Sequence, residues 1–274
     1  MKNRIAIAIP LLAILALGFF WAPMRFLPVV LIGLLGMISV NELSGMAKQR
    51  GSRVLRRIAS VSVVILLLLG FFGRYDLVPL FLGVVTPAAF VARMKVGGIE
   101  GAWRDVASTL GAAIYVGLPL ASLAFLFTAG FEARMWLLMM LTIIFCTDSA
   151  AMIFGKKFGK NKIFPTLSPG KTWEGSIGGL SGALLPPLIF MICLPELFHG
   201  TGALELAAVA ILFSGLAQLG DLSESFLKRD AGVKDSGRAL GAHGGALDRI
   251  DAALIVAVPF HGYLALFQPG VFLQ

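Results

Sequence analysis

The sequence predicts an all-α, polytopic integral membrane protein with about nine transmembrane helices and a cytoplasmic N-terminus. Three observations support this fold class: 58% of the 274 residues are hydrophobic, only 14% are charged, and the mean hydropathy is +0.88. A soluble domain carries about a quarter charged residues and buries much less apolar surface per residue. The composition therefore excludes an ordinary soluble fold.

Nine apolar segments approach the roughly 20 residues that a helix needs to cross a bilayer. We expect them, in chain order, at residues 5–20, 27–43, 58–72, 77–92, 106–128, 135–154, 175–194, 204–219 and 247–267. The first segment follows basic residues as in a signal peptide, but no small-residue cleavage site follows it, so we expect a retained helix. The third and fourth segments are short, which favours a tight hairpin around residues 73–76.

The basic residues support this topology. If the N-terminus is cytoplasmic, 20 of the 23 Lys and Arg residues fall on the cytoplasmic side, and only Arg25, Arg74 and Arg134 fall outside. This is the bias that the positive-inside rule describes for inner-membrane proteins. The net charge of +8 is therefore mostly a topology signal, and we expect no nucleic-acid partner.

The polar residues divide the chain into two parts. Residues 1–140 contain few intramembrane ionisable groups, of which Glu42 is the main one, and we interpret this part as a scaffold with roles in lipid access and oligomer contacts. In residues 141–274, carboxylates, lysines and hydroxyls gather at cytoplasmic helix ends, so we expect the catalytic site there. The sequence leaves the oligomeric state open, a homodimer included.

The first polar cluster is Thr147-Asp148-Ser149, near the cytoplasmic end of the sixth expected span. A carboxylate in hydrocarbon costs about 2.5–3.5 kcal/mol on insertion scales, so Asp148 should face a polar cavity or a partner. The structural alternative is an ion pair with a lysine such as Lys156.

The second cluster lies before the seventh expected span. Residues 170–172 resemble the end of a phosphate-binding P-loop, but Pro165 stands where that loop needs glycine and no strand precedes it, so a Walker A motif is excluded. Ser168 or Thr172 can instead cap the following helix, whose N-terminal amides, with Lys171, would then face an anion.

The third cluster begins at the end of the eighth expected span. Asp221, Glu224, Ser225 and Lys228 occupy positions i, i+3, i+4 and i+7, so a continuous helix aligns them on one face. A glycine-rich stretch at residues 232–245 follows, and its spacing permits close backbone approach to a ligand.

The ninth expected span then begins with Asp248 and Asp251, which also share a helix face. Carboxylates from two helices, with basic residues between them, are what a divalent cation bound to a polyphosphate requires. Interfacial ion pairs are the structural alternative, namely Asp230 with Lys234 and Asp248 with Arg249. This alternative accounts for Asp230 but not for the convergence of Asp221 with the two carboxylates of the ninth span.

These clusters resemble the phosphatidate cytidylyltransferases, also called CDP-diacylglycerol synthases. The resemblance lies in Ser225-Phe226-Leu227-Lys228-Arg229, Lys234-Asp235, Leu240-Gly241-Ala242-His243-Gly244-Gly245 and Asp248-Arg249-Ile250-Asp251, with an upstream run at residues 148–175. It covers residues 147–262, whereas the first half is similar mainly in hydropathy. Ala246 departs from the family, which usually has a larger aliphatic residue there, and we expect this to change packing rather than chemistry.

The resemblance implies transfer of the cytidylyl group of CTP to phosphatidic acid within the bilayer, with Mg²⁺ and room for a second cation. On this hypothesis Asp221, Asp248 and Asp251 bind metal and form the catalytic set with Lys228 and Arg229. The substrate contacts are then assigned to Asp148, Ser168, Lys171, Thr172, Glu174, Lys234, His243, Gly244, Gly245 and Arg249.

Two alternatives remain at this stage. An ion or solute transporter would line a path across the membrane with the carboxylates of Asp148, Asp221 and Asp251. Against it, the ionisable clusters lie at one face, and the outer half of each expected span lacks a polar counterpart. A related lipid-phosphate nucleotidyltransferase, or an inactive lipid-binding member, is the other alternative, and the intact carboxylates argue against inactivity.

Overall fold

The computed structural model describes residues 14, 16–198, 200–237, 239 and 244–272, and over these ranges it is all-α, as predicted. The α-helices are α2 (Phe26–Gln49), α3 (Arg56–Phe71), α4 (Val78–Val96), α5 (Ala102–Thr128), α6 (Phe131–Phe158), α7 (Trp173–Gly182), α8 (Leu185–Cys193), α9 (Ala203–Asp230) and α10 (Leu247–Phe267). Short 3-10 helices occupy Ala22–Met24, Tyr75–Leu77, Pro195–Phe198 and Pro269–Phe272. Extended pairing in the described ranges is limited to one isolated bridge between Lys162 and Thr172.

Seven segments of the described chain are long and apolar enough to cross a membrane. The helix α3 adds a short apolar segment of 16 residues, as expected for the third span. Most of the first expected span lies outside the described residues, so the total of nine stays a prediction. The seventh expected span is not one helix but two, α7 and α8, because Pro186 and Pro187 occupy the first turn of α8, where a continuing helix would need their missing N–H groups.

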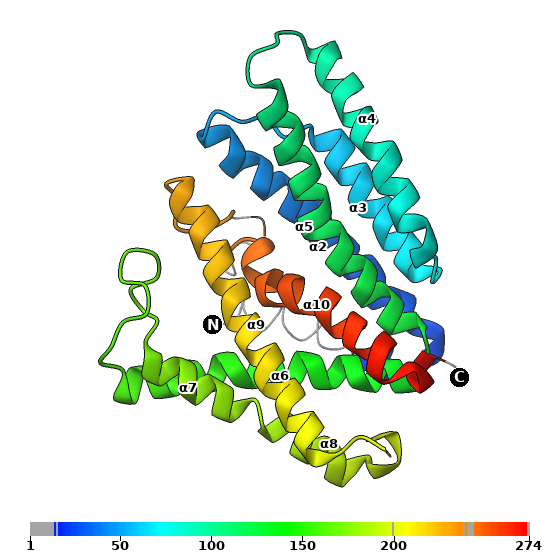
Figure 1. The fold of residues 1–274 in the computed structure, drawn as a ribbon, viewed down its shortest axis with the longest axis vertical. Helices are drawn as coiled ribbons and strands as arrows, with labels where there is room; N and C mark the ends of the chain where they lie inside the picture. Colours follow the sequence, from blue (N-terminus) through cyan, green and yellow to red (C-terminus); the bar gives the residue numbers. More distant parts are fainter. Residues whose placement is uncertain (1–13, 15, 199, 238, 240–243, 273–274) are drawn as a thin grey trace.

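The helices α2 to α5 pack side by side, and α10 lies between α5 and α9 (Figure 1). Close approach of α3 to α5 depends on glycine: a Cβ at Gly70 would lie 2.1 Å from the Ala121 carbonyl oxygen, and one at Gly117 would lie 2.5 Å from Leu66 Cδ1. Gly51, with a φ of +69°, turns the chain between α2 and α3. The helices α2 to α5 thus form a tightly packed group beside α10.

The glycines of α7 face α6, which runs across the bottom of Figure 1. A Cβ at Gly178 would lie 2.4 Å from Phe154 Cβ, and one at Gly182 would lie 2.4 Å from Ala150 Cβ. The small-residue surface in α7 is therefore used for packing within the chain. A hydrogen bond of 2.9 Å between the buried hydroxyls of Thr147 and Ser214 then joins α6 to α9.

Candidate functional site

Three carboxylates from α9 and α10 meet where these two helices pack together. Asp221, Glu224 and Asp251 each offer one oxygen, and the three oxygens lie within 4.8 Å of one another. Because α9 continues through Asp230, Asp221 and Glu224 share a face, as predicted. Gly220 allows α10 to approach, since a Cβ there would lie 2.8 Å from the Asp251 carbonyl oxygen. We call Asp221, Glu224 and Asp251 the acidic trio.

Lys228 connects the acidic trio to Asp248. Its ammonium donates to Glu224 Oε2 at 2.8 Å and to Asp248 Oδ1 at 2.7 Å. The other oxygen of Glu224, Oε1, is buried and has no hydrogen-bond partner among the described residues. An unpaired buried carboxylate oxygen is costly, so its position beside two further carboxylates fits a bound cation.

Asp248 lies next to the acidic trio rather than within it. Besides the bond from Lys228, its Oδ2 accepts the backbone N–H of Gly245 at 3.0 Å and that of Ser236 at 3.4 Å. The structure thus places Glu224 with Asp221 and Asp251, whereas the sequence predicted Asp248 as the third metal-binding carboxylate. The helical spacing of Glu224 from Asp221 was the available signal.

A cavity of about 280 Å³ adjoins the trio between α6, α7 and α9. Its lining includes Asp148, Lys171, Thr172, Gln218 and Asp221. The Lys171 ammonium pairs with Asp221 at 2.7 Å and donates to the Gln218 carbonyl at 3.3 Å. Four residues that the sequence predicted as site residues therefore share one polar cavity, and no ion pair joins Asp148 to Lys156 in the described chain.

The loop between α6 and α7 is shaped by the predicted polar residues themselves. Thr172 is the N-cap of α7, and its hydroxyl accepts the Gly175 N–H at 3.1 Å. The Glu174 carboxylate accepts the backbone N–H of Lys160 and both the backbone and side-chain N–H groups of Asn161. Glu174 therefore closes the loop, while Ser168 lies in the turn that leads to Lys171.

Other predicted residues lie farther from the trio or outside the described chain. Arg229 donates to the Leu167 carbonyl at 3.3 Å and so ties α9 to the same loop. Lys234 is exposed, and Gly244 has a φ of +81°, a conformation that favours glycine. His243 lies outside the described residues, whereas Arg249 is in the first turn of α10.

Glu42 of α2 holds the glycine-rich stretch from the opposite half of the chain. Its buried carboxylate accepts the Ser236 hydroxyl at 2.9 Å, the Ala246 N–H at 3.0 Å and the Leu247 N–H at 2.9 Å. A Cβ at Gly237 would lie 2.3 Å from Glu42 Oε1, and one at Gly245 would lie 2.9 Å from it. These two glycines thus permit the backbone to approach Glu42 closely, whereas the glycine spacing predicted close approach to a ligand.

The ion pairs expected on the structural alternative have different partners. Asp230 pairs with Arg50, which directly follows α2, at 2.7 Å, not with Lys234. Asp248 pairs with Lys228, which is half-buried on the same face of α9 as Glu224. The pairs of this alternative were chosen by spacing along the sequence, which favours near neighbours, whereas helix packing brings remote groups closer.

Comparison with known proteins identifies the family to which this chain is similar. The model of the cytidylyltransferase family matches residues 2–267. A phosphatidate cytidylyltransferase of Staphylococcus saprophyticus is 40% identical over 154 residues, which cover 56% of this chain and 57% of that protein. Phosphatidate cytidylyltransferases of Staphylococcus aureus and Staphylococcus epidermidis are each 33% identical over 241 residues, or 84% of this chain and 90% of theirs.

Proposed function

The chain belongs to the cytidylyltransferase family, and from this membership we propose that it transfers the cytidylyl group of CTP to phosphatidic acid in phospholipid biosynthesis. The products are CDP-diacylglycerol and pyrophosphate. The observation that carries the proposal is the acidic trio beside the cavity that contains Lys171, at the ends of membrane-spanning helices. A transporter has no support among the relatives.

The reaction joins a phosphate oxygen of phosphatidic acid to the α-phosphorus of CTP and breaks the bond to the β-phosphate. Two anions must meet, so the protein's main task is to neutralise charge and align the reactants. A general base is not needed, because the second ionisation of a phosphomonoester, with a pKa of about 6, already leaves a nucleophilic oxygen at neutral pH.

We propose that the acidic trio holds a divalent cation, Mg²⁺ by preference for hard oxygen ligands and phosphates. The unpaired Oε1 of Glu224 and the crowding of three carboxylate oxygens fit such an ion. When bound, it would offset the negative charge of the phosphates. Asp248, held by Lys228 and by the Gly245 amide, is the carboxylate available to a second cation.

The basic residues divide between positioning and phosphate binding. Lys171 extends into the cavity and is the first candidate to contact the phosphates of CTP. Lys228 keeps the carboxylates of Glu224 and Asp248 in place. For Arg229, Lys234, His243 and Arg249 we retain substrate binding as the proposed role, which the resemblance of their motif to the family implies.

The proposed location is the cytoplasmic membrane of a bacterial cell, with the site on the cytoplasmic side. The trio and Asp148 lie in the parts of α6, α9 and α10 nearer the ends that the distribution of Lys and Arg assigns to the cytoplasm, and Lys171 lies in a loop on that side. A lipid phosphate in the membrane and a soluble triphosphate meet at this interface.

One assay tests the activity. Purified protein in detergent receives phosphatidic acid, MgCl₂ and CTP labelled on the α-phosphate, and label is counted in the organic phase. Label in CDP-diacylglycerol is expected with CTP and Mg²⁺, and is lost with EDTA. Absence of label, in a preparation where a known phosphatidate cytidylyltransferase gives it, would contradict the proposal.

A further inference from the structure

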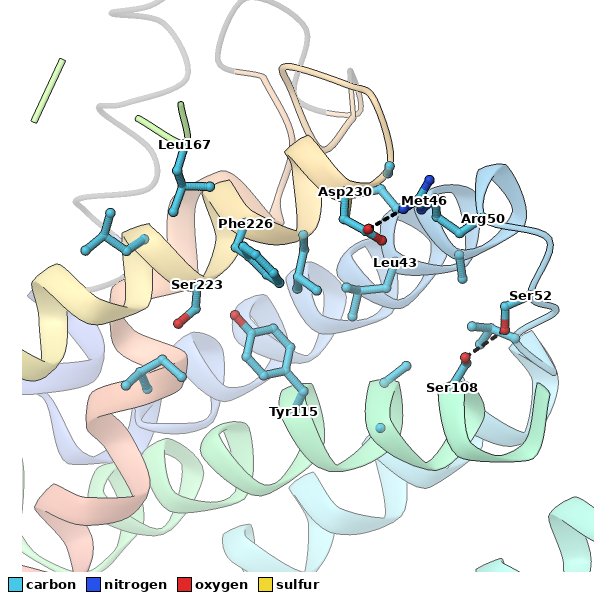
Figure 2. Close-up of a pocket in the computed structure, with 18 of the residues that line it drawn as sticks. Leu43, Met46, Arg50, Ser52, Ser108, Tyr115, Leu167, Ser223, Phe226 and Asp230 are labelled. Carbon is cyan, nitrogen blue, oxygen red and sulfur yellow. Dashed lines mark hydrogen bonds and ion pairs between the residues drawn. The ribbon is translucent and has the colours of Figure 1, made fainter. Parts of the chain in front are cut away.

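A second and larger cavity, of about 850 Å³, lies between α2, α5 and α9 (Figure 2). Its size is in the upper part of the range of about 300–1,000 Å³ found for small-molecule sites. Most of its lining is apolar and comes from helices of both halves of the chain, with two residues from the loop before α7. The apolar lining includes Leu43, Met46, Ala112, Phe164, Leu167, Leu219, Leu222 and Phe226.

The polar groups of this cavity lie at its two ends. At one end, Arg50 pairs with Asp230 at 2.7 Å, and the hydroxyls of Ser52 and Ser108 are 2.7 Å apart (Figure 2). At the other end lies the hydroxyl of Tyr115. The cavity is therefore an apolar space with polar groups at both ends.

The Tyr115 hydroxyl is buried and has no hydrogen-bond partner among the described residues. Figure 2 shows it directed from α5 toward Ser223 and Phe226 of α9. Glu224 follows Ser223 in the chain, and the Tyr115 hydroxyl lies within electrostatic range of Glu224 and Asp251 of the acidic trio. A buried donor without a partner, close to the proposed reaction centre, fits an oxygen atom of a bound ligand.

The lining also contains large apolar side chains that the protein leaves uncovered. Phe226 is 63% exposed, Leu219 is 51% exposed and Phe164 is 48% exposed. In a membrane-spanning chain, hydrocarbon covers such side chains at no cost, and an acyl chain can enter from the bilayer.

We propose that this cavity holds the acyl chains of the phosphatidic acid acceptor and that Tyr115 donates to an oxygen of its phosphoglycerol head. The proposal rests on the proposed function and adds where the lipid substrate binds. We infer a lipid occupant because the cavity and the acidic trio adjoin along α9. Ser223 and Phe226 of α9 line the cavity, and Glu224 belongs to the trio. A lipid with its acyl chains in the cavity therefore has its phosphate within reach of the cation site.

Gly111 of α5 allows a test that fills the cavity without disturbing the protein. It lines the cavity, and a Cβ added there meets no atom within 4 Å. Gly45 of α2 is the matched control, because it is also an exposed helical glycine with open space around its Cβ, but it does not line the cavity. We therefore compare Gly111→Leu with Gly45→Leu.

The kinetic readout separates the lipid from the nucleotide. Loss of contact with about two methylene groups predicts about a tenfold rise in the KM for dioleoyl phosphatidic acid in Gly111→Leu. The KM for CTP, and the KM for dihexanoyl phosphatidic acid, should stay within twofold of the unmodified protein. Tyr115→Phe should raise the KM for both lipids about fivefold, since it removes a hydrogen bond to the head group. Equal kinetics in Gly111→Leu and Gly45→Leu would overturn the proposal.

A binding readout keeps this test independent of turnover. Phosphatidic acid with a photoreactive diazirine in one acyl chain should crosslink to cavity-lining peptides of α5 and α9, less so in Gly111→Leu, and unlabelled phosphatidic acid should compete better than phosphatidylcholine. An inactive protein that retains this crosslinking would refute the proposed reaction and support the lipid cavity. Crosslinking that phosphatidylcholine suppresses equally well, or that Gly111→Leu leaves unchanged, would refute the cavity as the acceptor site.

Discussion

Two buried charged clusters in this chain have opposite hydrogen-bonding states. In the first half, the side chains of Arg93 and Asp105 are each only 8% exposed and pair at 2.8 Å. The guanidinium also donates to three backbone carbonyls between residues 97 and 100, and Asp105 accepts the Arg53 N–H at 2.7 Å. Partners within the chain thus occupy both carboxylate oxygens.

In the second half, Lys228 pairs with Glu224 and Asp248 at similar burial, yet Glu224 Oε1 stays without a partner among the described residues. Asp221 and Asp251 add further negative charge within 4.8 Å. Burial alone therefore does not separate a structural cluster from a functional one. The hydrogen-bonding state distinguishes these two clusters. The paired polar atoms of Arg93 and Asp105 stabilise the fold, whereas the unpaired Glu224 Oε1, beside two further carboxylates, indicates a bound cation.

The largest effect is expected from Asp221→Ala, which removes a carboxylate of the trio and the partner of Lys171. Loss of one preorganised charged group at a reaction centre predicts a fall in kcat of roughly 1,000-fold. The organic-phase assay with labelled CTP measures it. Asp76→Ala is the control, since its exposed pair with Arg74 predicts less than a twofold change. Similar losses in both variants would remove the distinction between trio and surface.

Arg93→Met tests the paired cluster of Arg93 and Asp105 and should act on stability. It leaves Asp105 buried without its partner, which predicts a loss of about 3–5 kcal/mol in the free energy of unfolding. Unfolding in mixed micelles, followed by circular dichroism, measures this loss, while kcat per folded molecule should not change. Arg74→Met, in an exposed pair with Asp76, should leave the free energy of unfolding nearly unchanged. A catalytic defect in folded Arg93→Met would show that this cluster is not purely structural.

Local spacing predicted most of the acidic site. The i, i+3 and i+7 relation of Asp221, Glu224 and Lys228 requires only that α9 continue to Asp230, as it does. The start of α10 at Leu247 then places Asp251 on its second turn. Helical periodicity and hydropathy are properties of a short window, so the sequence contains them in full.

Partners that helix packing brings together lie too far apart in the sequence for a short window to predict them. The three hydrogen bonds of Glu42 reach across 194 to 205 residues, and no periodicity links α2 to the glycine-rich stretch. The available signal was the free-energy cost of the Glu42 carboxylate at the end of an apolar span. This cost predicts that Glu42 has a polar partner but does not identify the partner. For the same reason the division at residue 140 remains a proposal, although Glu42 and the large cavity join the two parts.

Glu224→Gln sharpens the comparison by keeping the shape of the side chain while removing its charge. Loss of one ligand charge predicts a 10- to 100-fold rise in the Mg²⁺ concentration for half-maximal activity. Binding of Mn²⁺, followed by electron paramagnetic resonance, gives a readout without turnover. Glu205→Gln is the matched control at the other end of α9, where Glu205 accepts hydrogen bonds from Tyr263 and Gln268. Unchanged Mn²⁺ affinity in Glu224→Gln would argue against the trio as the cation site.

The smallest effect is expected from Ser236→Ala, which removes one of the three hydrogen bonds to Glu42. A hydrogen bond to a charged group contributes about 1.5–3 kcal/mol, but the two backbone N–H donors remain, so we expect kcat to fall about threefold to tenfold. Glu42→Gln should lower kcat further, because the amide nitrogen of glutamine is a donor and cannot accept a hydrogen bond from one of these N–H groups. If Glu42 only stabilises the fold, both variants would lower the unfolding temperature and leave kcat per folded molecule unchanged. A graded fall in kcat, with an unchanged unfolding temperature in Ser236→Ala, would instead show that the first half of the chain positions the glycine-rich stretch for the reaction.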